Sequence, residues 1–347
     1  MFYIHQTVCI SPQITFPEAN LEQLIICNEN KLYAKEPSYE GIPTGILRRM
    51  GKAVRLGVAA ALPLFKLNDQ LDGIIIGTAN GGMEDCIKFL NQIMQYEEGV
   101  LTPTNFVQST SNAVASQLGF FSKNKGYNIT HVHRGLAFEN AIIDAEMLLD
   151  DNKEHTYLLG GLDEISTYNF NIDYLCGYIK KESITNADLY TGKTEGSIAG
   201  EGVSMFVVNN NSKDAISNFR AIQTIHTTDD KELAAVFKKF LAENLSDRET
   251  VDLFLTGENG DFRYENVYET LESILKEDTV VARYKHMCGE YQTASSFALW
   301  LSGWILQNQN VPMHMLKTSL KKNEIANIVI YSNYQGFQHS FMLLSKV

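Results

Sequence analysis

The sequence predicts an α/β fold made of two similar halves around a largely parallel sheet. Three observations support this: strand-like apolar runs alternate with helix-like runs, glycine turns follow the strands, and the second half repeats the order of the first. The chain has 347 residues, enough for two ordinary domains or one large unit with a substantial core. Its hydrophobic content of 44% and charged content of 20% are typical of globular proteins.

Apolar runs that end in glycine turns indicate the strands of the first half, and apolar residues at helical spacing indicate its helices. We expect strands within 1–12, 71–82, 155–166 and 196–210, and helices over 83–96 and around 48–55. Residues 128–145, NITHVHRGLAFENAIIDA, predict a short strand, a sharp turn and an amphipathic helix.

The second half repeats this order. We match 251–261 with 71–82, 267–277 with 83–96, 284–306 with 130–149, and 326–347 with 155–164 and 203–208. The polar, turn-rich segment 207–218 is the expected seam, so we divide the chain into halves 1–210 and 211–347 of one intertwined unit. The alternative is that many α/β proteins alternate in this way without any duplication.

Charge and composition narrow the function classes. A net charge of −12 argues against nucleic-acid binding as the main role. The sequence has no run of 18 apolar residues and no secretory signal, so we expect a cytoplasmic protein without membrane insertion. The five cysteines have no metal-type spacing, and the glycine turns 81–85 and 256–261 lack the lysine of a phosphate loop. We therefore expect neither a metal nor a cofactor.

The segment 128–145 has the layout of a nucleophile elbow, in which a reactive side chain lies at the N-terminus of a helix. The polar side chains at this turn are His131, His133 and Arg134, and the turn holds no Cys or Ser. An elbow of this kind lacks the usual nucleophile for covalent catalysis.

Six segments in order resemble the β-ketoacyl synthases of the thiolase superfamily. They are 48–61, 101–119, 130–136, 158–164, 198–208 and 285–290. The resemblance covers most of the chain. It implies a thiolase-like fold, with duplicated βαβαβ halves in a layered α-β-α-β-α architecture.

The resemblance also assigns the catalytic positions. Family members have a cysteine three residues before the elbow glycine, and with Gly135 as that glycine the position is Val132. The first catalytic histidine of the family corresponds to Thr256 in LTGENGD. The second, which closes the motif K-S-M-T-G-H, corresponds to Glu290 in KHMCGE, where Lys285 is retained.

These replacements remove the condensing chemistry. Condensation needs a thiolate to carry the acyl chain and neutral imidazoles to stabilise the enolate, and one lost donor typically costs about 3–4 kcal/mol. We expect no condensation by this chain alone. It resembles most closely the chain-length factors, which pair with an active ketosynthase in type II polyketide, aryl polyene and flexirubin-type pathways.

Two further hypotheses stay open. The first is an acyl-thioester enzyme that uses His131, His133, Arg134 and Glu290 instead of Cys-His-His, and the second is a free-standing acyl-binding or scaffold protein. Under the subunit hypothesis, we expect the two histidines to fill space left by the lost active site or to lie at a dimer contact. Arg134 is expected to pair with Glu290 and close the pocket.

Other pocket candidates come from the neighbouring segments. Cys288 lies near the supposed site, and we expect it to be buried and inert. Residues 334–340 correspond to the glycine-rich gate of the family. Gln335, Phe337 and Gln338 there predict a fixed wall.

The expected partners are an active ketosynthase and an acyl carrier protein, with a homodimer possible when the chain is alone. The basic residues Arg48, Arg49, Lys52 and Arg55 are docking candidates for the acidic carrier protein, and the alternative is a solvated helix face with internal ion pairs. The segment Pro103–Gly119 is expected to contribute to the partner interface.

Overall fold

The computed structural model describes residues 1–68, 70–99, 101, 103–322 and 324–347. The strands are β1 (Phe2–Ile10), β2 (Lys31–Leu32), β3 (Gly73–Gly77), β4 (Tyr127–His131), β5 (Thr156–Asp163), β6 (Ala199–Gly200), β7 (Gly202–Asn209), β8 (Ser217–His226), β9 (Leu253–Thr256), β10 (Val280–Arg283), β11 (Asn327–Tyr334) and β12 (Gln338–Ser345).

The α-helices are α1 (Thr44–Leu47), α2 (Lys52–Leu67), α3 (Met83–Gln95), α4 (Pro103–Gln108), α5 (Ala113–Ser122), α6 (Ala137–Asp151), α7 (Thr167–Leu175), α8 (Asp230–Asn244), α9 (Glu265–Glu272), α10 (Lys285–Cys288) and α11 (Ala294–Asn308). Short 3₁₀ turns add η1 (Arg134–Leu136), η2 (Asn186–Asp188), η3 (Phe262–Tyr264) and η4 (Met313–Met315).

The order of the ten-stranded sheet displays the duplication directly. From its centre outward, the first half runs β1-β7-β5-β3-β4 and the second runs β8-β12-β11-β9-β10. When the five strands of each half are numbered along the chain, both halves place them in the same order from the centre outward: first, last, fourth, second and third. The halves meet where β1 pairs with β8. The predicted thiolase-like fold with duplicated halves is confirmed, and we propose that their boundary lies at 210/211, between β7 and β8.

The sheet is mixed, and the expectation of a largely parallel sheet was wrong. Parallel pairing joins β4, β3 and β5 in one half and β10, β9 and β11 in the other. The other pairings are antiparallel. The parallel pairs are joined through long segments that contain helices, as parallel pairing requires. Among the antiparallel pairs, β5 reaches β7 through a long segment that contains α7, whereas β11 and β12 are joined by a tight turn.

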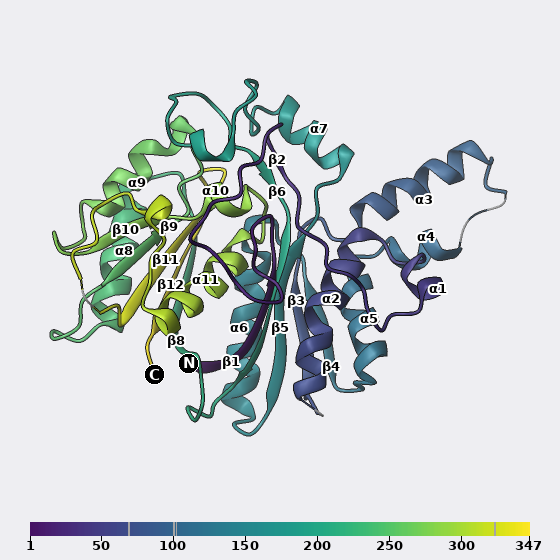
Figure 1. The fold of residues 1–347 in the computed structure, drawn as a ribbon, viewed down its shortest axis with the longest axis horizontal. Helices are drawn as coiled ribbons and strands as arrows, with labels where there is room; N and C mark the ends of the chain where they lie inside the picture. The colour runs from purple at the N-terminus through teal and green to yellow at the C-terminus, as the bar shows by residue number, and fades with distance from the viewer. Residues whose placement is uncertain (69, 100, 102, 323) are drawn as a thin grey trace.

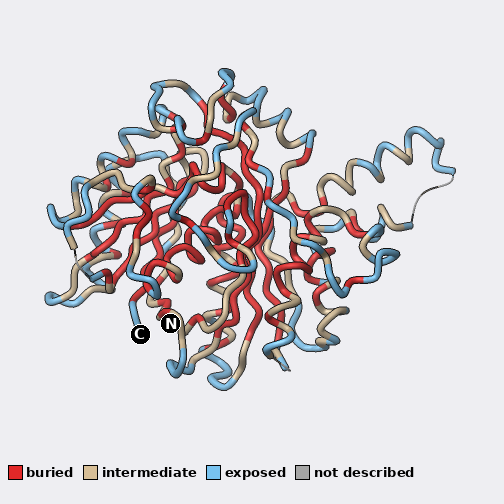
Figure 2. The backbone as a smooth tube through the Cα atoms, in the orientation of Figure 1, coloured by how far each residue is buried: buried red, intermediate tan, exposed pale blue. Residues whose placement is uncertain are grey.

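Side-chain alternation along the strands builds three layers of apolar core. In β3, Ile75 packs with α6 and α11 in the central layer, while Ile74 and Ile76 point to the opposite face and pack with α2 and α5. In the second half, Phe254 packs with α8 and α9 on the outer face. Figure 2 shows the central elements as the most buried part of the chain.

Two features at the edge of the fold bear on partners. Helices α3 and α4 form an arm that projects beyond the layers (Figure 1), and α3 has no buried residue. Within the described ranges, no helix has the length and apolar character needed to cross a membrane.

Candidate functional site

The predicted elbow is present between β4 and α6. The strand ends at His131, and the chain turns through Val132 and His133 into η1 and then α6. Arg134 takes the left-handed backbone conformation, with φ of 48°. A Cβ on Gly135 would lie 2.2 Å from Cβ of Tyr334, so this position requires glycine. The close packing of Tyr334 on the turn holds the second half against the elbow.

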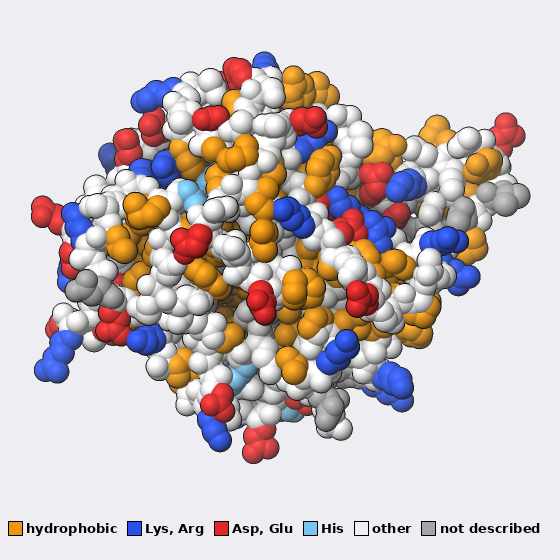
Figure 3. Space-filling model, in the orientation of Figure 1, with side chains coloured by type: hydrophobic (Ala, Val, Ile, Leu, Met, Phe, Trp, Pro, Cys, Tyr) orange, Lys and Arg blue, Asp and Glu red, His pale blue; other side chains and the backbone are white. Residues whose placement is uncertain are grey.

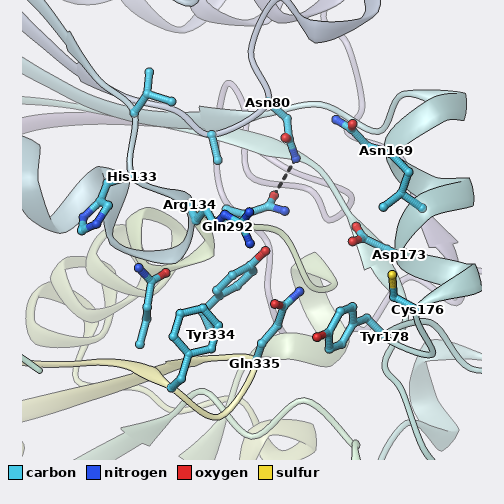
Figure 4. A pocket seen from close by; sticks show the side chains of 15 residues that line it. Asn80, His133, Arg134, Asn169, Asp173, Cys176, Tyr178, Gln292, Tyr334 and Gln335 are labelled. Atoms are coloured by element: carbon cyan, nitrogen blue, oxygen red, sulfur yellow. Dashed lines mark hydrogen bonds between the residues drawn. The ribbon is translucent and has the colours of Figure 1, made fainter. Parts of the chain in front are cut away.

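The elbow forms one wall of an open pocket of about 850 Å³ (Figure 4). The other walls are the turn after β3, helix α7 with the segment behind it, and the β11–β12 hairpin. Its lining residues are Ala79, Asn80, Val132, His133, Arg134, Asn169, Ile172, Asp173, Cys176, Tyr178, Gln292, Tyr334, Gln335, Phe337 and Gln338. Val132, which is 53% exposed, therefore presents an alkyl group to this pocket at the nucleophile position.

The two positions that the resemblance assigns to catalytic histidines, Thr256 and Glu290, lie outside this pocket. Thr256 is buried at the end of β9, where its Oγ1 accepts a hydrogen bond of 3.3 Å from the N–H of Glu258. The Glu290 carboxylate binds Lys285, with 2.8 Å between Nζ and Oε1, and accepts a bond of 2.9 Å from Nδ2 of Asn259. Lys285 is only 1% exposed. The residues at both positions thus make internal structural contacts.

The expected Arg134–Glu290 pair was wrong. Lys285 is the nearer partner of Glu290, because α10 and Glu290 belong to the same turn. Among the described residues, Arg134 makes no ion pair. Glu290 instead lines a small cavity of about 30 Å³, which shares Tyr334, Gln335 and Asp173 with the larger pocket.

The two elbow histidines do not converge. His131 Nε2 lies 2.9 Å from Oδ2 of Asp144 and does not line the pocket. His133 does line it, with its Nδ1 2.9 Å from Nδ2 of Asn140 and its ring 5.4 Å from the ring of His226. Of the four residues in the alternative catalytic set, the pocket brings together only His133 and Arg134.

The hairpin that replaces the family gate is tied to the elbow. Gln335 and Gly336 both have positive φ, 54° and 73°, as the two central residues of a tight hairpin turn require. Gln338 Oε1 accepts a hydrogen bond of 3.0 Å from the N–H of Gly135, so its side chain satisfies a backbone donor near the start of the helix. Phe337 lines the same wall. These contacts fit the expected wall of Gln335, Phe337 and Gln338.

Polar side chains that the sequence did not single out complete the site. Asn80 Nδ2 donates to Oε1 of Gln292 at 2.9 Å, and Gln292 in turn contacts the hydroxyl of Tyr334. Burial raises the pKa of Tyr334 to about 12, so its hydroxyl stays protonated. Burial, with the negative charge of Glu290, raises the pKa of Asp173 to about 6. Asn80 and Gln292 lie in turns within segments 71–82 and 284–306, which the sequence pattern did indicate. Asp173 lies on α7, a helix that no sequence pattern indicated.

Cys288 is fully buried, as expected, and burial raises the pKa of its thiol well above the ordinary value. A buried neutral thiol is a poor nucleophile. The described part of the chain holds no group of three or more His, Cys, Asp or Glu side chains placed to bind a metal ion.

The four basic docking candidates do not share one helix. Lys52 and Arg55 belong to α2, and Arg48 and Arg49 lie in the turn before it. Lys52 pairs with Glu201, and the Arg55 guanidinium makes two bonds of 3.1 Å to Glu36. Arg48 and Arg49 are exposed at the rim of a second pocket of about 430 Å³.

Comparison with known proteins finds one family match, within the N-terminal half. Residues 27–170 match the β-ketoacyl synthase N-terminal domain. No curated protein matches the chain.

Solved ketosynthase structures match the fold over the whole chain. The ishigamide ketosynthase/chain length factor has a TM-score of 0.76 at 12% identity, covering 100% of this chain and 99% of that one. The ketosynthase ApeO in complex with its chain length factor ApeC, from Xenorhabdus doucetiae, has a TM-score of 0.76 at 12% identity, with 100% and 98% covered. A β-ketoacyl synthase from Burkholderia phymatum STM815 has a TM-score of 0.77 at 12% identity, with 100% and 99% covered. At such identities the likeness establishes the fold.

Proposed function

We propose that this chain is a non-catalytic ketosynthase-like subunit of the chain-length-factor type, which pairs with an active ketosynthase in polyketide- or fatty-acid-type biosynthesis in the cytoplasm. The observation that carries the proposal is Val132 at the elbow, where an alkyl group faces the pocket in place of a nucleophile. Without a thiolate the covalent acyl intermediate cannot form.

The partner residues of the lost chemistry support the same conclusion. Thr256 is buried, and Glu290 is held by Lys285 and Asn259. A carboxylate at this position would repel a developing enolate, where a catalytic centre must present donors. Restoring a thiol at position 132 would therefore leave the remaining machinery absent.

An exposed apolar surface gives the proposed subunit a place for its partner. β4 is the outermost strand of the sheet, and an open strand edge invites pairing with another chain. In the same half of the chain, the α3–α4 arm exposes Leu90, Met94, Phe106 and Val107, and Figure 3 shows hydrophobic side chains on this arm. We assign the ketosynthase interface to β4 and this arm, which includes part of the segment Pro103–Gly119.

Two of the four basic docking candidates remain available for the carrier protein. Lys52 and Arg55 are engaged in ion pairs with Glu201 and Glu36, whereas Arg48 and Arg49 are exposed and make no ion pair with any residue that the structure describes. We propose these two as the docking residues. Surface charges of this kind mainly raise the association rate.

An acyl-thioester enzyme is the second candidate, and the open pocket is the observation that favours it. His133 and Arg134 line this pocket as possible base and oxyanion donor. However, His131 contacts Asp144 and Glu290 contacts Lys285, so the proposed four-residue set is incomplete in one cavity.

Co-purification with the ketosynthase encoded next to this chain tests the proposal. We expect a stable 1:1 complex and malonyl-carrier condensation that depends on the cysteine of the partner. Phe106→Asp should break the complex, and Met313→Asp, at an exposed methionine on η4 outside the proposed interface, is the matched control. If the chain stays alone and turns over an acyl thioester in a reaction that His133→Ala abolishes, the subunit proposal is wrong.

A further inference from the structure

The elbow pocket contains two opposite charges that the fold leaves unpaired. Arg134 comes from the elbow and Asp173 from α7, and Figure 4 shows them on opposite walls of the same hollow. In the described part of the chain, neither side chain makes an ion pair or a side-chain hydrogen bond. Both charges act on the pKa of the Tyr334 hydroxyl, which Asp173 raises and Arg134 lowers.

The wall around Arg134 is equipped for a carboxylate. The guanidinium offers five donors in a planar fork that matches a carboxylate. The amides of Asn80 and Gln292 lie beside it. Arg134 is also held at a φ of 48°, and a left-handed residue that is not glycine costs on the order of 1 kcal/mol. Such strain at a pocket is typical of a functional position.

The wall around Asp173 is equipped for a cation. The ring of Tyr178 lines the pocket next to it, and it already attracts one cation, because the guanidinium of Arg263 lies 5.5 Å from the ring centroid. Glu290, in the small adjoining cavity, adds negative potential at Asp173. Glu290 itself is paired with Lys285, whereas Asp173 has no ion-pair partner among the described residues.

We propose that this pocket binds an aminocarboxylate, a small molecule with a carboxylate that meets Arg134 and an ammonium that meets Asp173. Val132, Ile172 and Phe337 supply apolar contacts for the carbon chain between or beside these charges. A volume of about 850 Å³ lies within the range of small-molecule sites. The inference goes beyond the partner-subunit role, because it concerns binding to this chain alone.

Isothermal titration calorimetry on the full chain tests the proposal. The probes are glycine, 4-aminobutyrate, 6-aminohexanoate and 8-aminooctanoate, with hexanoate and hexylamine as controls that carry one charge each. We expect at least one aminocarboxylate to bind about tenfold or more tightly than either control, since each charge-assisted bond contributes about that much. The best chain length then distinguishes an α-aminocarboxylate from an ω-aminocarboxylate.

Two variants, each of which removes one charge from the pocket, test which residue binds which end of the ligand. Arg134→Gln should lower the affinity for the best probe about tenfold and abolish hexanoate binding, while Asp173→Asn should do the same for hexylamine. Arg248→Gln, at an exposed arginine outside the pocket, should change neither. The proposal is overturned if no aminocarboxylate binds more tightly than hexanoate and hexylamine, or if no probe binds at all. Complex formation with a ketosynthase is measured separately, so the two proposals can fail independently.

Discussion

Removing the Glu290 carboxylate should strongly destabilise the fold. The resemblance to β-ketoacyl synthases assigns this position to a catalytic histidine, so a structural role is not what the family pattern would predict. Lys285 is 1% exposed, and its ammonium has Glu290 as its ion-pair partner at 2.8 Å. Glu290→Ala leaves this charge buried without a counter-ion. It also removes the acceptor for Asn259.

The expected magnitude follows from the asymmetry of buried ion pairs. Breaking such a pair by removing one partner typically costs about 3–5 kcal/mol, because the remaining charge has lost both water and its counter-ion. Replacing both partners with apolar residues of similar volume is often neutral or stabilising. We therefore expect Glu290→Ala to lower the free energy of unfolding by about 3–5 kcal/mol, and the double variant K285M/E290L to recover most of that loss.

Urea denaturation followed by circular dichroism measures both variants, with the midpoint compared at constant slope. Glu243→Ala, at an exposed carboxylate that contacts Lys239 at the surface, is the matched control and should cost under about 1 kcal/mol. The reasoning is refuted if Glu290→Ala is no more destabilising than this control. It is also refuted if the double variant is as unstable as the single one.

Three further predictions test other parts of the site. Burial raises the pKa of Glu139 from 4.5 to about 7, so its contribution to stability is fully present below pH 4.5 and is lost as the pH rises to about 7. Glu139→Gln should remove about 3 kcal/mol of that pH dependence, measured as the difference between unfolding curves at pH 4.5 and 7.5; an unchanged slope would contradict it. Gly135→Ala should cost about 1–3 kcal/mol in urea melts because its Cβ meets the Cβ and ring of Tyr334, and the cost should disappear in a Tyr334→Gly background, which removes both. Val132→Cys should not give condensation in a malonyl-carrier assay, since Thr256 and Glu290 supply no imidazole; measurable product from the isolated variant would show that the lost histidines are dispensable.

The fold was largely predictable because its strands carry a clear pattern. The segments 71–82 and 251–261 each contain a short, continuous apolar run, and these runs form β3 and β9, in which every residue is buried. The antiparallel pairing of the inner strands was not predicted. Whether two strands pair in parallel depends on the path of the chain between them, and apolar periodicity carries no information about that path. β8 was not predicted at all, since it begins inside the polar segment chosen as the seam.

The site was less predictable, because its contacts join distant segments. The elbow at 128–145 followed from local pattern alone, and so did the absence of a nucleophile. The partner of Glu290 did not, because Arg134 and Lys285 are equally basic in sequence and only the fold places Lys285 within 2.8 Å. Asp173 was missed for a similar reason: nothing in α7 marks one carboxylate as facing a pocket formed by three other segments.

The elbow keeps its shape without a nucleophile because packing now holds it. Tyr334 occupies the space beside Gly135, and Gln338 binds the N–H at the helix start. Glu290 in turn neutralises the buried Lys285. Each of these side chains serves stability, so the geometry of the turn does not depend on a nucleophile at position 132. The pocket in front of Val132 nevertheless stays open, and among the described residues its Arg134 and Asp173 have no ion-pair partner. We have proposed a ligand for these two charges, so the pocket is the first place to search for one.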